Sequence, residues 1–274
     1  MCKPTYYTIA YEINPWMHIR RQADHPRALH QWSALYRLLT QRLQVSVRLL
    51  PPVRGLPDLV FTANAGLVVG RTVIRSRFRF PERQGEEPVV ERYFRRHGYR
   101  VVRLPRTFNF EGAGDALWIG STLLFGFRFR SDAAAHERLS RLLRCEILPV
   151  ELVDQRFYHL DTCFCPLGPR SALWYPKAFD RYGRQVITSC VQDLIEVSEA
   201  DARRFCCNSV VVGRHLVMPT GVSRSLSRTL ESQGWTIHVV DLSEFLKAGG
   251  AAKCLVLHLN QPGGFESASS SAGR

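Results

Sequence analysis

The chain has 274 residues, 45% of them hydrophobic and 22% charged, which is the composition of an ordinary globular protein. No apolar run reaches the roughly 18 residues of a transmembrane helix, and the N-terminus lacks the basic and apolar regions of a secretory signal, so we expect a cytoplasmic protein. The formal net charge of +13 is mostly scattered arginine. This scatter disfavours nucleic-acid binding and suits a general compositional bias or an anionic group on a substrate.

Short apolar runs alternate with amphipathic segments along the chain. Strands are predicted, in chain order, at 59–61, 66–69, 72–74, 99–102, 123–125, 209–212 and 236–240. Helices are predicted at 26–43, 86–97, 132–143 and 223–233. Gly98 and Gly234 follow two of these helices at the position of a C-capping glycine. The alternation predicts an α/β fold.

A polar residue stands beside six of the apolar runs at nearly constant spacing. Gaps of 50, 47, 48, 49 and 46 residues separate Asn14, Asn64, Glu111, His159, Asn208 and Cys254. Such spacing is typical of a repeated module, and modules that each hold strands and a helix can close into a ring. Chance is the alternative explanation. In a ring the marked residues would converge, and buried polar groups would need a ligand or one another as partners.

The segment 157–165, FYHLDTCFC, combines a histidine, a carboxylate and two cysteines. We expect a strand with His159 and Asp161 on one face, continued into the core by Cys163 and Cys165. A metal site here lacks further ligands at workable spacing, and none of the eight cysteines belongs to a CxxC motif. Most of the thiols are therefore expected to be buried and free.

One cysteine, one histidine and several carboxylates form a chemically coherent set if the marked residues converge. A thiolate can attack an electrophilic carbon while a histidine moves protons, which is covalent catalysis. Carboxylates that face the substrate favour a cationic group, and a planar guanidinium suits paired carboxylates. In the stretch EGAGD, two glycines leave room beside Glu111 and Asp115. An alternative for Asp115 is that it braces this glycine turn.

Five segments resemble the guanidino-modifying enzymes, which include arginine deiminases, dimethylarginine dimethylaminohydrolases, amidinotransferases and arginine or succinylarginine dihydrolases. The segments are FTANAG, FEGAGDAL, YHLDTCF, CNSVVVG and EFLKAGGAAKCLVL, within a resemblance that extends from residue 5 to 259. The resemblance implies a five-bladed α/β propeller with pseudo-fivefold repeats of about 48 residues. It implies one catalytic domain, 1–259, and the Ser/Gly-rich stretch 260–274 is predicted to be a disordered tail.

The same resemblance implies roles for the converging residues. Cys254 would be the nucleophile that forms a covalent amidino intermediate, and His159 would be the general acid/base. Glu111 and Asp161 would hold the guanidinium, and Asp115 would support them. No metal and no organic cofactor are implied.

The resemblance also implies substrate-binding roles for residues outside the most specific motifs. Arg130 in FRFRSD resembles the arginine that binds the substrate's α-carboxylate, and Arg83 is a second candidate for that task. Asn64 stands where the deiminases carry aspartate and the dihydrolases carry asparagine. An amide can hydrogen-bond a ureido oxygen, so citrulline could stay bound for a second hydrolysis to ornithine, with Asn14 as a partner. A reaction that stops at citrulline, including release of methylamines from methylated arginine, is equally open.

The predicted function is cysteine-dependent hydrolysis of the guanidino group of arginine or an arginine derivative. An amidinotransferase and a non-catalytic arginine-binding member of the family are the alternatives. For Cys254 the alternative is a buried thiol in a last strand, AKCLVLHL; Cys207 is a competing nucleophile that we expect to be a core thiol. Asn208 is expected to satisfy backbone groups. The expected partner is a small guanidino substrate, without nucleic acid or membrane, and a homodimer stays open.

Overall fold

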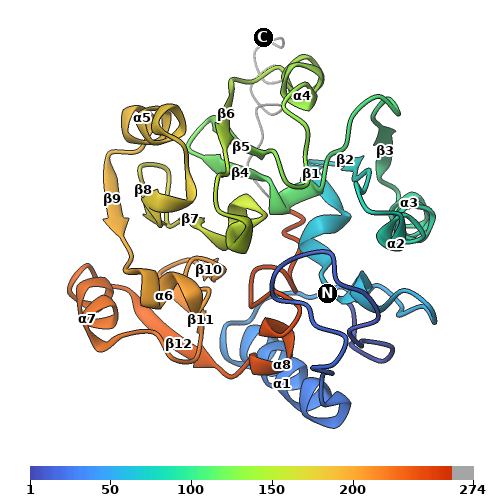
Figure 1. Ribbon diagram of the computed structural model, residues 1–274, viewed down its shortest axis with the longest axis horizontal. Coiled ribbons are helices and arrows are strands. Elements are labelled where there is room, and N and C mark those ends of the chain that lie inside the picture. Colours follow the sequence, from blue (N-terminus) through green and yellow to red (C-terminus); the bar gives the residue numbers. More distant parts are fainter. Residues whose placement is uncertain (261–274) are drawn as a thin grey trace, which may run out of the picture.

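Four three-stranded sheets organise the computed structural model, in which residues 1–260 are described. In each sheet the first strand pairs antiparallel with the second, and the second pairs parallel with the third. The sheets follow one another around the centre in chain order, anticlockwise from β1–β3 to β10–β12 (Figure 1). The predicted α/β fold is confirmed.

The strands are short, and successive sheets begin at Gly66, Ala116, Phe164 and Val210, which are 50, 48 and 46 residues apart. The strands are β1 Gly66–Val69, β2 Thr72–Arg75, β3 Arg100–Arg103, β4 Ala116–Ile119, β5 Thr122–Phe127, β6 Ile147–Glu151, β7 Phe164–Pro166, β8 Ser171–Trp174, β9 Asp193–Glu196, β10 Val210–Val212, β11 His215–Pro219 and β12 Thr236–Val240.

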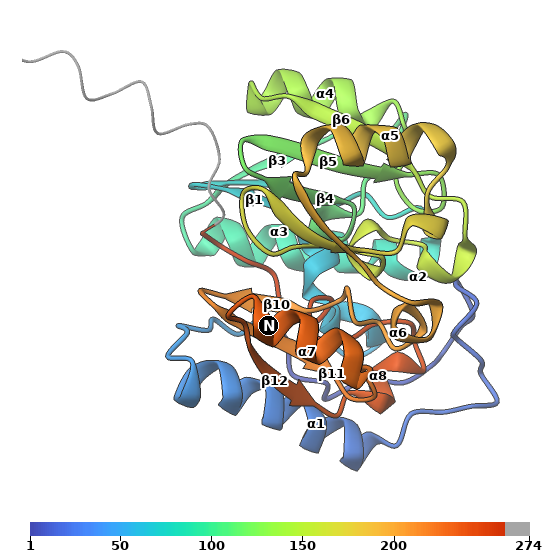
Figure 2. The same ribbon diagram turned by 90° about the vertical axis from the view of Figure 1, so that its left-hand side faces the viewer.

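The longer helices lie at the periphery, as both views show (Figure 1, Figure 2). Each parallel pair needs a crossover, and α3, α4, α5 or α7 lies in each of the four connections. The helices are α1 His25–Arg37, α2 Pro81–Gln84, α3 Glu86–Arg96, α4 Ala135–Leu143, α5 Arg181–Cys190, α6 Glu199–Arg203, α7 Arg224–Ser232 and α8 Ser243–Leu246. Helix α1 continues into a π-helical turn, Leu38–Arg42.

Most predicted elements are confirmed with shifted ends. Gly98 and Gly234 have φ angles of +74° and +79° and follow α3 and α7 as C-capping glycines do. The predicted strand 59–61 is wrong, because the chain forms a 3₁₀ turn at Pro57–Val60. Five strands (β4, β6, β8, β9 and β11) and the helices α2, α5 and α8 were not predicted. Several of these strands have only four residues, too few for a period of two to stand out.

The marked polar residues lie in turns that enter the sheets. Asn64 lies in the 3₁₀ turn Thr62–Ala65 before β1. Glu111 and His159 directly precede 3₁₀ turns that lead into β4 and β7, and Asn208 lies in a turn before β10. The predicted strand for FYHLDTCFC is therefore wrong before Phe164, and Cys254 lies in a turn rather than in a last strand. A turn can aim side chains toward the centre, whereas the alternation of a strand would send half of them outward.

The five-bladed propeller is not confirmed, because residues 1–260 contain four sheets of this topology and not five. The N-terminal fifty residues contribute α1 and an isolated parallel bridge between Cys2 and Leu50. The predicted disordered tail falls, from residue 261 on, outside the described residues. Within residues 1–260, no helix is both long and apolar enough to cross a membrane.

Candidate active site

Glu111 and His159 form a buried acid–base pair at the centre of the molecule. His159 Nε2 lies 2.8 Å from Glu111 Oε2, and both side chains are at most 1% exposed. Burial acts to raise the pKa of Glu111, but the charges of Arg130 and the contact with His159 outweigh it and hold that pKa well below its usual range. Glu111 is therefore an anion that can stabilise a cation beside the imidazole.

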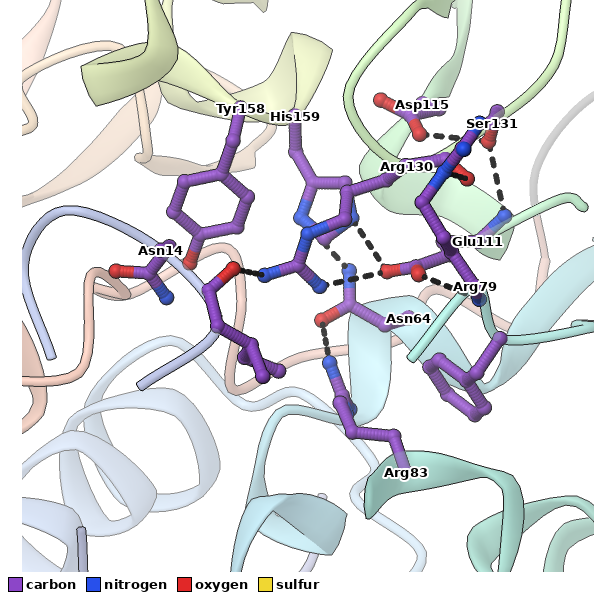
Figure 3. Close-up of polar contacts among 12 residues, drawn as sticks. Asn14, Asn64, Arg79, Arg83, Glu111, Asp115, Arg130, Ser131, Tyr158 and His159 are labelled. Atoms are coloured by element: carbon purple, nitrogen blue, oxygen red, sulfur yellow. Dashed lines mark hydrogen bonds and ion pairs between the residues drawn. The ribbon is translucent and has the colours of Figure 1, made fainter. Parts of the chain in front are cut away.

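A guanidinium of the protein itself already contacts this anion. Arg130 donates from Nη1 to Glu111 Oε2 at 3.1 Å and from Nη2 to the Ile13 carbonyl at 3.0 Å. Its guanidinium carbon lies 4.8 Å from the ring centre of Phe80 and 4.6 Å from that of Tyr158, so two aromatic faces flank it. Figure 3 shows Glu111 between Arg130 and His159. These side chains supply the anion and the flat aromatic faces that a guanidinium requires.

Asn64 connects His159 to a second buried arginine. Arg83 donates from Nη1 to Asn64 Oδ1 at 3.0 Å, and Asn64 Nδ2 lies 3.5 Å from His159 Nδ1 (Figure 3). Arg83 also forms a bidentate pair with Glu86, at 2.8 and 2.9 Å. Arg83 belongs to α2, which brings it next to the turn that carries Asn64.

Asp115 braces the turn that carries His159. It accepts hydrogen bonds from Ser131 Oγ at 2.6 Å and from the Leu160 N–H at 3.1 Å. Burial raises the pKa of Asp115 to about 6, although His159 and the Ser131 hydroxyl act in the opposite direction. Both side-chain contacts are to the segments of Ser131 and Leu160 and not to the glycine turn, so they match a residue that supports its neighbours in the site.

Cys254 has a separate set of partners. Asn208 Nδ2 donates to Cys254 Sγ at 3.1 Å, and the thiol lies 3.7 and 3.9 Å from the two oxygens of Asp161. Asn208 Oδ1 accepts from the backbone N–H groups of Ala251 and Cys254, as expected for a residue that satisfies a turn. The contact of Asn208 with the thiol was not predicted, although its place in the spacing series was a signal for it.

Burial disfavours the charged forms of Cys254 and of Asp161 beside it. Burial, and then the charge of Asp161, raise the pKa of the Cys254 thiol well above its usual range. Burial raises the pKa of Asp161 to about 7, and Lys253 opposes that shift. Lys253 is 7% exposed, its Nζ has no hydrogen-bond partner within the described residues, and burial lowers its pKa. This half of the site therefore needs an incoming cation to favour a thiolate.

The remaining predicted residue, Asn14, lies at the edge of the centre. Asn14 Nδ2 donates to the Ala248 carbonyl at 3.1 Å and Oδ1 accepts from the Trp16 N–H. Tyr158 donates to the Gly249 carbonyl at 2.8 Å, which ties the same segment to the turn before His159. Asn14 therefore holds the segment that leads to Cys254.

Two cavities lie beside this centre rather than within it. One, of about 460 Å³, is lined by Asp161, Lys253 and His258 among others, and another, of about 750 Å³, is lined by segments 43–50 and 256–260. Cys254, His159 and Glu111 line neither cavity. The side chain of Arg130 contacts Glu111, and the ring of Tyr158 packs against that of His159. Within residues 1–260, no cluster of three His, Cys, Asp or Glu side chains could hold a metal ion.

Cys207 lies outside the polar centre. It is completely buried in a hydrophobic cluster together with Cys163, Cys165 and Cys206. Burial, followed by the contact with Cys206, raises its pKa well above the usual range. All eight cysteines are unpaired.

Comparison with known proteins agrees with this arrangement. The family model described as "N,N dimethylarginine dimethylhydrolase, eukaryotic" matches residues 11–261. A dimethylarginine dimethylaminohydrolase of Mycobacterium tuberculosis is 38% identical over 260 residues, which cover 95% of this chain and 85% of that protein.

Cyanobacterial proteins are also similar. The bifunctional arginine dihydrolase/ornithine cyclodeaminase AgrE of Nostoc sp. is 46% identical over 96% of this chain, and the chain spans only 38% of that protein's length. The crystal structure of the N-terminal domain of ArgZ, an arginine dihydrolase, bound to substrate superposes with a TM-score of 0.92 at 43% identity, covering 96% of this chain and 97% of that domain.

The shared fold and the match over nearly the whole chain define a protein of the guanidino-modifying superfamily. Within it, the chain belongs to the dimethylarginine dimethylaminohydrolase family.

Proposed function

We propose that the protein is a cysteine-dependent hydrolase that acts on the guanidino group of arginine or an arginine derivative. The observation that carries this proposal is the contact of Glu111 with both His159 and the guanidinium of Arg130. A carboxylate that binds a guanidinium beside an imidazole is the arrangement that hydrolysis of a guanidino carbon needs. Similarity to dihydrolases and dimethylargininases supports the same chemistry.

Substrate binding involves a change of partner for Arg130. Glu111 Oε2 already contacts Arg130 and His159, and Oε1 accepts from the Arg79 N–H at 3.2 Å. A substrate guanidinium at this carboxylate therefore displaces Arg130. The displaced guanidinium is then available for the α-carboxylate of the substrate, the role that the family resemblance implies.

The first hydrolysis uses Cys254 and His159 in turn. The Cys254 thiolate attacks the guanidinium carbon and forms a C–S bond, while His159 donates a proton to the departing nitrogen, which leaves as ammonia or as a methylamine. His159 then accepts a proton from a water that attacks the amidino carbon. The C–S bond breaks, the thiol is restored and citrulline is formed. Asp161 and Glu111 stabilise the cationic substrate.

Arginine as substrate and ornithine as final product are our preferred version of this proposal. Citrulline and one water then give ornithine, ammonia and carbon dioxide. The amide of Asn64 supports it, because an amide N–H can bind the ureido oxygen of citrulline. The cyanobacterial relatives named as arginine dihydrolases are also more similar, at 46% identity, than the dimethylargininase at 38%. Arrest at citrulline is the second candidate.

Mass analysis of products decides between these versions. The purified protein is incubated separately with arginine, dimethylarginine and succinylarginine, and ammonia is counted per substrate consumed. Two ammonia and ornithine from arginine are expected, whereas one ammonia with accumulating citrulline contradicts the second hydrolysis. Transfer of the amidino group to an added amine would identify an amidinotransferase, and no turnover of any substrate would leave a binding protein.

For the whole molecule we propose a single catalytic domain over 1–259 with a pseudo-fivefold arrangement. The series of marked residues and the segment around α1, which follows the fourth sheet around the centre in Figure 1, support this arrangement. The unpaired state of all eight cysteines supports a cytoplasmic location, where thiols are kept reduced. A homodimer remains a prediction.

A further inference from the structure

We propose that the cavity of about 460 Å³ beside the centre is a binding site for a small organic carboxylate with an apolar body. The nucleophile Cys254 and the pair of Glu111 and His159 do not line this cavity. The site is therefore separate from that of the proposed reaction, and its occupation can be measured without turnover.

The cavity lies between the innermost strands of three sheets. It is lined by residues of β4, β7 and β10, which lie next to the centre in Figure 1. Its rim includes Gly120 and Pro169, which are exposed and belong to the connections that follow β4 and β7. Its lining also includes Asp161, which is fully buried. A molecule that enters at the exposed rim can therefore reach buried polar groups.

Two side chains that line this cavity have buried donors without partners. Trp118 is 9% exposed and Lys253 is 7% exposed. Neither the indole Nε1 of Trp118 nor the ammonium Nζ of Lys253 has a hydrogen-bond partner among the described residues. Both groups can only donate, and a buried donor without an acceptor is costly. The complementary ligand therefore carries acceptor atoms.

The charge of Lys253 selects an anion among the possible acceptors. A carboxylate supplies the negative charge that pairs with the ammonium, and its two oxygens give the ligand more than one acceptor. Asp161 is the lining residue that would repel an anion, but burial raises its pKa to about 7, against the charge of Lys253. Near pH 6 this carboxyl is mostly neutral. Burial lowers the pKa of Lys253, and the same mildly acidic pH favours its charged form.

Apolar side chains make up most of the remaining wall. They include Leu117, Phe164, Leu167 and Val211. Small-molecule sites commonly combine such walls with a few polar groups, in cavities of about 300–1,000 Å³. An inorganic anion would leave this wall without contacts, whereas a hydrocarbon or aromatic body would bury its surface against it. The wall therefore favours an organic ligand.

Occupation of the cavity should affect the neighbouring thiol. Burial raises the pKa of Cys254 and of Asp161, and the charge of Lys253 opposes both shifts. A carboxylate paired with Lys253 cancels that opposing charge, so the thiolate becomes less favourable. Alkylation of Cys254 by iodoacetamide at fixed pH should then slow roughly threefold or more. A rate that saturating ligand leaves unchanged would overturn this coupling.

Binding is tested with phenylacetate as the probe and the indole N–H of Trp118 as the readout. In ¹H–¹⁵N NMR spectra at pH 6, the Trp118 resonance, identified by its loss in Trp118→Phe, should shift downfield because the N–H gains an acceptor. Trp32 is the matched control, since its buried Nε1 also has no partner within residues 1–260 but Trp32 lines neither cavity. Its resonance should not move. An unchanged Trp118 resonance at about 10 mM phenylacetate, enough to saturate a site with a Kd of about 1 mM, overturns the proposal.

Substitution of the ammonium tests the charge. Lys253→Met retains an apolar side chain of similar length, and the affinity for phenylacetate should fall roughly tenfold or more. Lys247→Met, at a lysine that pairs with Glu244 outside the cavity, is the control and should retain the affinity. Equal affinity of Lys253→Met and the unaltered protein contradicts the proposal.

A neutral analogue covers the case in which Lys253→Met fails to fold. In the unaltered protein, 2-phenylethanol has the same body without the charge and should bind roughly tenfold more weakly than phenylacetate. Equal binding of the alcohol would overturn the choice of a carboxylate. Saturating arginine added to Cys254→Ser should leave the phenylacetate-induced shift of Trp118 in place. Loss of the shift would place phenylacetate in the substrate site and overturn a separate one.

Discussion

The two halves of the site differ in how completely their polar groups are paired. Around His159, the carboxylate of Glu111, two guanidinium groups and the Asn64 amide contact one another at hydrogen-bond distances. Around Cys254, the thiol has one close donor, Asn208, and a carboxylate at 3.7 Å. The Lys253 ammonium there has no hydrogen-bond partner among residues 1–260.

This difference in pairing indicates which half needs the substrate to complete its polar contacts. In the His159 half, Glu111 and His159 are already in contact before any ligand arrives, which is the preorganisation that proton transfer requires. In the Cys254 half, burial raises the pKa of both the thiol and Asp161, so their charged forms are disfavoured. In the proposed reaction, a substrate guanidinium supplies a positive charge beside them. Substitutions in the His159 half and in the Cys254 half should therefore have different effects on turnover and stability.

The largest expected effect is loss of the nucleophile. Cys254→Ser should reduce turnover by roughly three orders of magnitude or more, because a serine hydroxyl without an activating base is a poor nucleophile. Cys207→Ser, a change in the hydrophobic cluster, should retain activity within about twofold. Mass spectrometry of the protein quenched during turnover should show the covalent adduct in the unaltered protein and in Cys207→Ser, but not in Cys254→Ser. The reverse pattern, with loss of the adduct in Cys207→Ser, would make Cys207 the nucleophile.

A somewhat smaller effect is expected in the His159 half. Glu111→Gln preserves shape but removes the charge that holds Arg130 and His159, so kcat/KM should fall by about 10²–10³-fold. Thermal stability should also fall, because breaking a buried pair leaves Arg130 unpaired. Glu87→Gln, in the Arg75 pair, serves as control and should preserve turnover. Equal activity of Glu111→Gln and the unaltered protein would refute the role of this carboxylate.

The thiol half can be tested through Asn208. Asn208→Ala removes the donor to Cys254 Sγ and the acceptor of two backbone N–H groups, and it should cost about 1–3 kcal/mol of unfolding free energy. Asn208→Asp retains the acceptor for the turn but loses the donor to sulfur. Both should slow alkylation of Cys254 by a neutral haloacetamide at fixed pH, roughly tenfold, whereas only the alanine variant should lose the turn contacts. Alkylation that is as fast in Asn208→Asp as in the unaltered protein would exclude a role of the donor.

The last expected effect concerns stability alone and is a pH dependence caused by Asp161. Its pKa is raised to about 7 by burial, against about 3.9 when unfolded, so the folded protein binds the proton more tightly. The contribution is fully present below pH 4 and is lost as pH rises from about 4 to about 7. Asp161→Asn should therefore gain stability relative to the unaltered protein over this range, by at most about 4 kcal/mol.

Denaturant unfolding at pH 4, 5.5 and 7 measures this difference. Asp193→Asn, at an exposed aspartate, is the control and should track the unaltered protein at each pH. A constant difference between Asp161→Asn and the unaltered protein across these pH values would mean that Asp161 is not protonated in the folded state.

Prediction from sequence succeeded where local pattern and chemistry agree. The capping glycines after α3 and α7 and the strands β1, β2 and β12 follow from short-range rules, and the marked residues Asn64, Glu111 and His159 do meet. It failed where tertiary packing overrides local preference. The stretch before Phe164 is apolar enough for the strand that was predicted, but its backbone forms turns there, and His159 and Asp161 contact partners at the centre.

The sequence by itself determined the α/β class and which reactive side chains the site can contain, because both follow from residue types and their spacing. Only the tertiary structure decided what each group does before a substrate arrives. Arg130 contacts a carboxylate 19 residues earlier, and Asn208 contacts a thiol 46 residues later. Asn64 accepts a hydrogen bond from Arg83, which lies 19 residues later in α2. Hydrogen bonds are short and directional, so partners distant in sequence can be assigned only once the turns that carry them are placed.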